Sequence, residues 1–329
     1  MMTVRIHAYE EISTIIYFHR NISLEDDVVI EEKYVISEEI GRLRPVSFSY
    51  EGHVLLGYSD SPNSKEIIYK PMEFISYWLI QSAPEIHLYA VWGEIDPNYG
   101  GVIFIGDSYV DTSNWPTHIA EGLGLTTYIE SDLGGTGFVN ALQDPWGTFT
   151  NFETLLNHAI VIAGEENRNQ YQWIIVEGGY NDQYYENEKV QDGIKKFIKR
   201  AKEAFPNAKI VVGMNGYHVY NADVRTMLEK TSSFYKEGTF KNGAYYIDGI
   251  EHIFTEEDTA IFMEDGFHPT GEGGKRIAEA SISAIHKIQN EISPLFWVGL
   301  CLLIVLIVLF CFFLKQQLLM NTSKKMNKR

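Results

Sequence analysis

The sequence predicts an α/β fold, in which a five-stranded parallel sheet flanked by helices is preceded by a small β-sandwich and followed by one transmembrane helix. Three observations support this prediction. Strand-like and helical patterns alternate after residue 98, short β-rich runs fill the chain before it, and an uncharged apolar run stands near its end. The predicted parts are a jelly-roll-like sandwich at 1–97, an α/β domain at 98–290, a membrane span at 295–314 and a basic tail at 315–329.

The first predicted domain consists of short runs rich in Val, Ile, Tyr and Phe that are separated by polar turns. Such spacing is typical of an all-β sandwich, here of roughly 90 residues. Its aromatic side chains fit two roles, either a surface on which glycans stack or packing in the core and between domains. The runs are Thr14–Phe18, Val28–Ile30, Val46–Tyr50, His53–Tyr58 and Ile86–Trp92.

The pattern after Gly101 predicts parallel strands joined by crossover helices that cover both faces of one sheet. In the predicted helix Glu188–Phe205, apolar residues recur at helical spacing while lysine and arginine lie on the opposite face. Gly271–Gln289 is the last predicted helix of this domain. The predicted strands are Val102–Ile105, Thr126–Ile129, Trp173–Val176, Ile210–Gly213 and Tyr245–Ile247.

Twenty residues from Leu295 to Leu314 carry no charge, and as a helix they would extend about 30 Å, the thickness of a hydrocarbon core. A buried core helix is the alternative, although core helices rarely lack every polar position. The basic residues from Lys315 onward place this end in the cytoplasm and the folded domains outside, by the positive-inside rule. The N-terminus lacks the apolar segment of a signal peptide. That lack is typical of a domain that stays in the cytoplasm, and so it conflicts with the orientation above. We expect a single-pass membrane protein with its main domain outside the cytoplasm.

The chain carries 44 acidic and 27 basic side chains and a formal net charge of −17. Five of the basic residues fall in the last fifteen positions, so the remainder of the chain is more acidic still. This balance disfavours nucleic acid as a partner, because its phosphates require a basic footprint. Both cysteines, Cys301 and Cys311, lie in the predicted span, which leaves no disulfide and no cysteine-based metal site in the folded domains.

Two short motifs point to nucleophilic catalysis. Ser108 follows Gly106 and Asp107 at the end of a predicted strand, where parallel sheets bind their ligands and where glycine allows a sharp turn. Ser108 is therefore a candidate nucleophile, and the alternative is an Asx turn or helix N-cap. Asp265 and His268 are three residues apart, so one loop can present a base for Ser108 together with the carboxylate that orients it. The alternative is a surface histidine ahead of the last helix.

Two further motifs also follow strand ends. The side-chain amide of Asn181 is a candidate donor to a developing oxyanion, and the alternative is a turn formed with Asp182. The glycines of Gly134–Gly137 can direct a bare backbone N–H into a pocket, and the alternative is a flexible loop. Together the four motifs supply the parts of a serine hydrolase: nucleophile, base, orienting carboxylate and oxyanion donors.

In this order the motifs resemble those of the SGNH (GDSL-like) hydrolases, which are named for Ser, Gly, Asn and His in four sequence blocks. Gly106–Ser108 is similar to the first block, Gly179–Asp182 to the third and Asp265–His268 to the last. The resemblance covers about 101–290 and is specific in these three blocks. For the second-block glycine we take Gly135, with Gly134 or Gly137 as alternatives.

The resemblance implies that Ser108 is the nucleophile, His268 the base and Asp265 the residue that orients it. It implies an oxyanion hole made of the backbone N–H groups of Ser108 and Gly135 and the side-chain amide of Asn181. It implies no metal and no organic cofactor.

A small β domain ahead of such a hydrolase resembles the two-domain carbohydrate esterases. With a membrane span, this suggests a membrane-tethered serine esterase that removes small acyl groups, O-acetyl above all, from an acylated small molecule or polysaccharide. Two alternatives stay open, namely a lipase or thioesterase for longer acyl chains and a non-catalytic glycan-binding surface protein. The segment Leu133–Thr150, with Phe138, Trp146 and Phe149, is a candidate substrate wall, although core packing fits these aromatics equally well.

Overall fold

The computed structural model describes residues 13–23, 25, 28–35, 41–75, 83–143, 148–217, 222–255, 257–290, 302–310, 312 and 315. The chain divides into two compact units, Met1–Ser283 and Ala284–Arg329. The first unit contains a five-stranded and a four-stranded sheet, two two-stranded ladders and all the candidate site residues.

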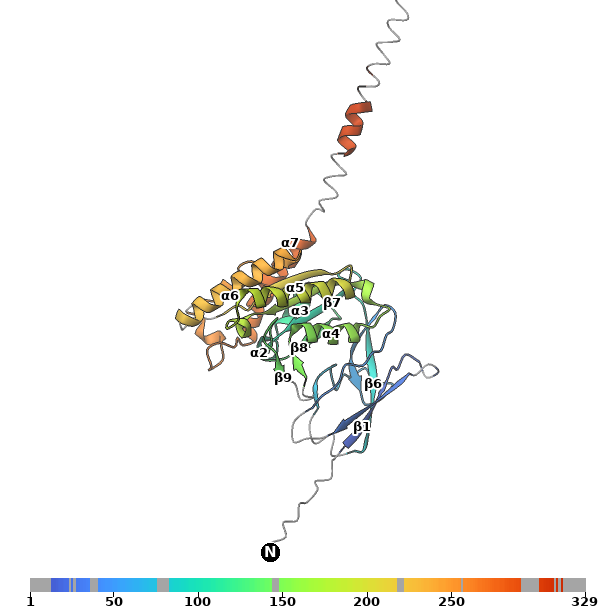
Figure 1. The fold of residues 1–329 in the computed structure, drawn as a ribbon. Coiled ribbons are helices and arrows are strands. Elements are labelled where there is room, and N and C mark those ends of the chain that lie inside the picture. The colour runs from blue at the N-terminus through green and yellow to red at the C-terminus, as the bar shows by residue number, and fades with distance from the viewer. Residues whose placement is uncertain are drawn as a thin grey trace, which may run out of the picture. The chain divides into compact units, whose positions relative to one another are not determined.

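Five parallel strands form the central sheet of the first unit (Figure 1). Their order across the sheet is β13-β12-β11-β7-β8, and every neighbouring pair is parallel. All six residues of β7 are buried, as expected for a strand covered on both faces. The predicted five-stranded parallel sheet is thus confirmed. The strands are β7 (Gly101–Gly106), β8 (Ile129–Asp132), β11 (Tyr171–Gly178), β12 (Lys209–Met214) and β13 (Tyr245–Tyr246).

One predicted strand of this sheet was misplaced. The sequence predicted a strand at Thr126–Ile129, whereas β8 begins at Ile129, opposite Ile103 of β7, and ends at Asp132. Thr127 instead donates its hydroxyl to the carbonyl of Glu94 at 2.8 Å, which fixes the approach to β8 against the N-terminal sheet. Because β8 is the edge strand, it alternates between buried and half-buried residues and lacks the continuous apolar run of a central strand.

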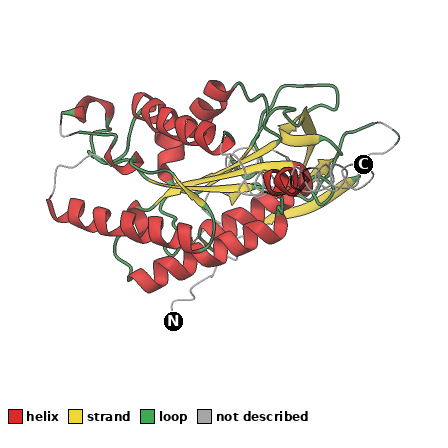
Figure 2. Cartoon of the chain, turned by 90° about the horizontal axis from the view of Figure 1, so that it is seen from above, coloured by secondary structure: helices red, strands yellow, loops and turns green. Residues whose placement is uncertain are grey.

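Helices cover the sheet on both faces (Figure 2). Helix α5 buries the apolar face that its sequence predicted, and its bounds agree with that prediction to within one residue. Helix α5 packs against both α4 and α6, while α4 also packs against β7 and β8 and α6 against β12 and β13. The helices are α2 (Ser108–Ser113), α3 (Trp115–Leu123), α4 (Phe152–Ala163), α5 (Asn187–Ala204), α6 (Ala222–Lys241) and α7 (Gly271–Gln289).

The N-terminal part forms a four-stranded sheet in the order β2-β1-β6-β4. It is mixed, because β1 and β6 run parallel while β2 and β4 pair antiparallel with their neighbours. Beside it, β3 pairs with β5 in a two-stranded ladder. The strands are β1 (Ser13–His19), β2 (Val29–Val35), β3 (Gly41–Arg42), β4 (His53–Ser59), β5 (Phe74–Ile75) and β6 (Glu85–Glu94).

This arrangement does not confirm the predicted sandwich. Strand β4 contacts α4 and β8, so elements of the α/β part help to cover the four-stranded sheet. Val46–Tyr50, predicted as a strand, is irregular, although Val46 and Phe48 are buried. A buried apolar run therefore indicated core packing there without indicating strand pairing.

Among the described residues, no helix is both long and apolar enough to cross a membrane. Of the predicted span 295–314, only Leu302–Phe310 and Phe312 are described, and these residues are helical with exposed side chains. The rest of that span, and all of the basic tail except Lys315, lies outside the described residues. The transmembrane helix stays a prediction.

Candidate active site

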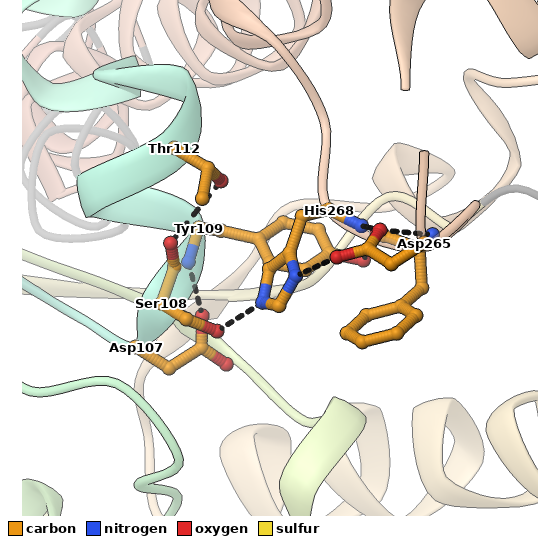
Figure 3. A network of polar contacts seen from close by, with 7 residues as sticks. Asp107, Ser108, Tyr109, Thr112, Asp265 and His268 are labelled. Carbon is orange, nitrogen blue, oxygen red and sulfur yellow. Dashed lines mark hydrogen bonds and ion pairs between the residues drawn. The ribbon is translucent and has the colours of Figure 1, made fainter. Parts of the chain in front are cut away.

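Ser108 is the first residue of α2, directly after the carboxyl end of β7 (Figure 3). Asp107 caps this helix, and its carboxylate accepts the backbone N–H of Tyr109 at 3.0 Å. The preceding turn requires glycine, because a Cβ on Gly106 would lie 2.4 Å from Cγ2 of Val110. The N-cap expected as the alternative to catalysis is therefore present, and it belongs to Asp107.

His268 and Asp265 come from the loop that precedes α7, and both lie beside Ser108 in space (Figure 3). The Nε2 atom of His268 is 2.8 Å from Oγ of Ser108. Its Nδ1 atom is 2.7 Å from Oδ2 of Asp265. Two hydrogen bonds thus join the three predicted residues into one chain, across 160 positions of sequence.

The loop that carries His268 is fixed at several points. Oδ1 of Asp265 accepts the backbone N–H groups of Phe267 and His268, each at 3.0 Å. The hydroxyl of Tyr109 donates to the carbonyl of Phe267 at 2.7 Å, which ties this loop to α2. The ring of Phe267 stacks on that of Tyr180, with centroids 5.3 Å apart. One carboxylate therefore sets both the backbone of the loop and the orientation of the imidazole.

The charge of Asp265 determines which nitrogen of His268 carries its proton. Desolvation opposes ionisation of Asp265, but hydrogen bonds from the backbone and ring of His268 and from Phe267 outweigh it and lower the pKa of the carboxyl. An ionised carboxylate only accepts hydrogen bonds, so Nδ1 of neutral His268 is the donor. Nε2 is then the acceptor for the hydroxyl of Ser108. This is the arrangement in which histidine can remove the proton of an attacking serine.

Asn181 lies in a short 3-10 turn, η2 (Tyr180–Asp182), after β11. Its amide nitrogen donates to Oδ2 of Asp107 at 3.2 Å and to the carbonyl of Thr136 at 2.9 Å. The structure thus brings Asn181 to the turn that carries Ser108. Both N–H groups of its amide have acceptors within the protein, so donation to an oxyanion requires that one of these contacts be exchanged.

The three candidate glycines differ in their surroundings. A Cβ on Gly134 would lie 3.4 Å from Cβ of Ser108, whereas one on Gly135 would lie 3.6 Å from the side chain of Leu142. Gly137 donates its N–H to the carbonyl of Asn140 at 3.0 Å. These contacts place Gly134, an alternative in the sequence analysis, beside Ser108, and they favour it over Gly135 as the neighbour of the nucleophile. The glycine donor to an oxyanion stays a prediction.

Sequence reasoning missed Asn215, which is buried directly after β12. Its amide nitrogen lies 3.4 Å from Oδ1 of Asp107, and its side-chain oxygen accepts the backbone N–H of Tyr180 at 3.1 Å. Asn215 therefore links the turn of Ser108 to the turn of Asn181. The signal that singled out Asn181, a side-chain amide at a strand end, also holds for Asn215.

Asp182 was expected only as a possible turn residue, and the structure gives it a larger role. Its side chain is fully buried and accepts the backbone N–H groups of Phe138, Val139 and Asn140 at 2.8, 3.1 and 2.8 Å. It also accepts the hydroxyl of Tyr235 at 2.7 Å. Asp182 thus holds the segment that follows the candidate glycines.

The candidate substrate wall Leu133–Thr150 is divided between core and surface. Phe138 is buried, with its ring against those of Phe152, Phe197 and Tyr235, which is the core packing that the sequence analysis left open. Phe149 is 67% exposed, in the two-residue strand β10 (Phe149–Thr150) that pairs with β9 (Leu142–Gln143). Trp146 lies outside the described residues.

Two buried carboxyl groups lie behind the site. Burial raises the pKa of Asp107 to about 7, against hydrogen bonds from Tyr109 and Asn215 that favour the charged form. Burial likewise raises the pKa of Glu177 to about 8, against the hydrogen bond from Ser281 at 2.6 Å. Within the described part of the chain, no group of three or more His, Cys, Asp or Glu side chains is placed to hold a metal ion.

The raised pKa of Glu177 predicts that stability depends on pH. The unfolded chain releases this proton near pH 4.5 and the folded protein near pH 8, so the folded state loses stability as the pH rises through this interval. The loss is at most about 1.4 kcal/mol per pH unit for one group. We expect Glu177→Gln to flatten the pH dependence of the free energy of unfolding, measured in urea between pH 5 and 8. Glu188→Gln, at an exposed position of α5, is the control, and an equal slope in both variants would contradict the prediction.

The sequence profile of the GDSL-like lipase/acylhydrolase family matches residues 104–276. No curated protein matches the chain. Among solved structures, Est24, a carbohydrate acetylesterase from Sinorhizobium meliloti, is 16% identical, with a TM-score of 0.43 over 57% of this chain and 99% of its own. A family two carbohydrate esterase from Clostridium thermocellum is 16% identical, with a TM-score of 0.45 over 60% of this chain and 65% of its own. The acetyl xylan esterase Est2A from Butyrivibrio proteoclasticus is 15% identical, with a TM-score of 0.40 over 61% of this chain and 67% of its own.

Proposed function

The chain belongs to the GDSL-like lipase/acylhydrolase family of carboxylic ester hydrolases, and we propose that it hydrolyses small acyl esters, O-acetyl esters of carbohydrates above all, through an acyl-enzyme on Ser108. The observation that carries this proposal is the chain of two hydrogen bonds from Ser108 through His268 to Asp265.

The geometry supports a two-step reaction. Oγ of Ser108 attacks the carbonyl carbon of the ester as its proton passes to Nε2 of His268, while Asp265 stabilises the imidazolium that forms. The tetrahedral intermediate collapses, and the proton on Nε2 goes to the departing alcohol. Water then attacks the acyl-enzyme with His268 again as base, which releases the acid and restores Ser108.

We assign stabilisation of the oxyanion to backbone N–H groups at Ser108 and in the glycine segment Gly134–Gly137, together with the amide of Asn181. The backbone N–H groups of Gly134 and Gly135 donate to no acceptor among the described residues, so either group is available to an oxyanion. Fixed donors of this kind matter because negative charge develops on the carbonyl oxygen only as the reaction proceeds.

The size of the acyl group distinguishes this proposal from a lipase or thioesterase. The test measures kcat/KM for p-nitrophenyl acetate, butyrate and octanoate, with and without a serine-directed phosphonate. We expect the acetate to be the best substrate and the phosphonate to abolish turnover. A preference for octanoate would favour a lipase, and no turnover at all would favour a glycan-binding protein that has kept a hydrolase scaffold.

We also propose that residues 295–314 tether the protein to a membrane, with the catalytic domain outside the cytoplasm. The uncharged sequence and the exposed apolar side chains of Leu302–Phe310 support the tether, and the basic tail supports the orientation. Extraction of membranes from expressing cells with alkaline carbonate tests the tether, since release of the full chain into the supernatant would contradict it. Protease treatment of intact cells tests the orientation, because an outward domain is cleaved.

A further inference from the structure

A cavity of about 450 Å³ lies between the N-terminal part of the chain and the edge strand β8. Its volume is within the range of pockets that bind small molecules. Apolar side chains form part of its wall, and charged side chains of both signs form the rest. The residues of the wall that matter below are Arg42, Lys70, Phe74, Asp111, Glu130 and Asp132.

Several charged groups of this wall have unused capacity for hydrogen bonds. Arg42 is only 6% exposed, and among the described residues its guanidinium makes one hydrogen bond, to the carbonyl of Asp132 at 2.7 Å. The guanidinium also lies 4.1 Å from the centre of the Phe74 ring. The carboxyl groups of Asp111 and Asp132 form no hydrogen bond or ion pair within the described parts of the chain. Arg42 is buried and Asp132 is half-buried, and such polar groups with unmade hydrogen bonds point to a ligand that supplies them, whereas Asp111 is exposed.

The wall of the cavity comes near Ser108 at Asp111. Asp111 follows Ser108 by three positions in α2, so both side chains lie on one face of that helix. A Cβ on Gly134 would lie 3.4 Å from Cβ of Ser108 and 3.9 Å from Oδ2 of Asp111. Ser108 is not part of the wall, and Asp111 is the wall residue that lies near it, on the other side of Gly134.

We infer that this cavity binds the alcohol part of the ester, and that this part is a ring rich in hydroxyl groups, such as a sugar unit. The inference rests on the proposed esterase function and adds where the leaving group lies. Hydroxyl groups both donate and accept hydrogen bonds, so in one pocket they can donate to carboxylates and accept from a guanidinium. The half-exposed ring of Phe74 offers an apolar surface beside them.

The same chemistry disfavours other occupants. A long acyl chain would bury Arg42, Asp111 and Asp132 against hydrocarbon with their hydrogen bonds unmade, which is costly. An anionic ligand would meet more carboxylates than cations, since Lys70 is already paired with Glu130 at 3.3 Å. A neutral polyol avoids both costs, because it can form hydrogen bonds with these groups and carries no negative charge.

The test compares two acetate esters that differ only in their alcohol, methyl acetate and a mono-acetylated methyl glucoside, in the full chain. We expect Asp111→Asn and Arg42→Gln to lower the ratio of kcat/KM for the sugar ester over that for methyl acetate about tenfold, as for the loss of one hydrogen bond. The matched controls are Asp192→Asn and Arg225→Gln, whose side chains form exposed ion pairs on α5 and α6, and they should keep the wild-type ratio.

An unchanged ratio in both cavity variants, or an equal fall in the controls, would overturn the inference. If Arg42→Gln fails to fold, the result rests on Asp111→Asn, because Asp111 is exposed. If the wild type hydrolyses neither ester, the esterase proposal fails, and the cavity is tested by calorimetry with methyl glucoside. Binding that weakens about tenfold in Asp111→Asn supports the cavity as a sugar site, and absence of binding to the wild type overturns it.

Discussion

Replacement of Ser108 by alanine is expected to lower kcat for ester hydrolysis by about 10⁴-fold or more while the protein stays folded. The reason is that the hydroxyl of Ser108 forms its one hydrogen bond among the described residues with Nε2 of His268, at 2.8 Å, so alanine removes the attacking oxygen and disturbs no other contact of that hydroxyl. His268→Ala should cause a loss of similar size, because Oγ then has no acceptor for its proton. The double variant should lose little more than either single one, since the two residues act as a unit.

The measurement is the turnover of p-nitrophenyl acetate, with circular dichroism and thermal unfolding to show that each variant is folded. Ser233→Ala is a matched control, because this serine is exposed on α6 and its hydroxyl donates to the carbonyl of Lys230 in its own helix. Wild-type turnover in Ser108→Ala or His268→Ala would refute the assignment of the nucleophile or the base.

Replacement of Asp182 by alanine is expected to cause a large loss of stability, about 3–5 kcal/mol in the free energy of unfolding. The substitution leaves three backbone N–H groups and the hydroxyl of Tyr235 without their acceptor in a buried place. The released segment adjoins Gly134–Gly137, so kcat for acetate esters should fall as well. Denaturation in urea, followed by fluorescence, measures the loss of stability.

Asp192→Ala is the control for this prediction, since Asp192 is exposed on α5 and forms an ion pair with Lys196 at 2.8 Å on the surface of that helix. Its effect on the free energy of unfolding should be small, because an exposed ion pair contributes little to stability. A stability of Asp182→Ala equal to that of the control would show that the segment after the glycines is held by other contacts.

Much of the α/β part could be predicted from local pattern. The apolar runs that became β7, β11 and β12 are continuous because both faces of each strand are covered, and that signal does not depend on distant residues. Helix α5 could be placed from its apolar spacing alone. The pattern failed at β8 and at Val46–Tyr50, where pairing partners from other parts of the chain decide the backbone conformation.

The candidate site shows the same division. Ser108 and Asn181 could be found because each closely follows the carboxyl end of a parallel strand, and these ends meet at one edge of the sheet. The Asp265–His268 pair lies in the loop before α7, well after β13, and its three-residue spacing indicated it instead. The choice among the glycines and the contribution of Asn215 could not be read in this way. Both depend on which side chains from distant segments lie within about 4 Å of the turn that carries Ser108.

The sequence by itself supplied the candidate catalytic groups of this protein: a serine after a strand and, far along the chain, an aspartate and a histidine three residues apart, in an order that resembles the family's motifs. Only the tertiary structure decided that these groups meet, that Gly134 is the candidate glycine nearest Ser108 and that a cavity with charged side chains in its wall lies at β8. The physical reason is that residue type and spacing set what a group can do, whereas its neighbours are set by packing between segments far apart in the chain.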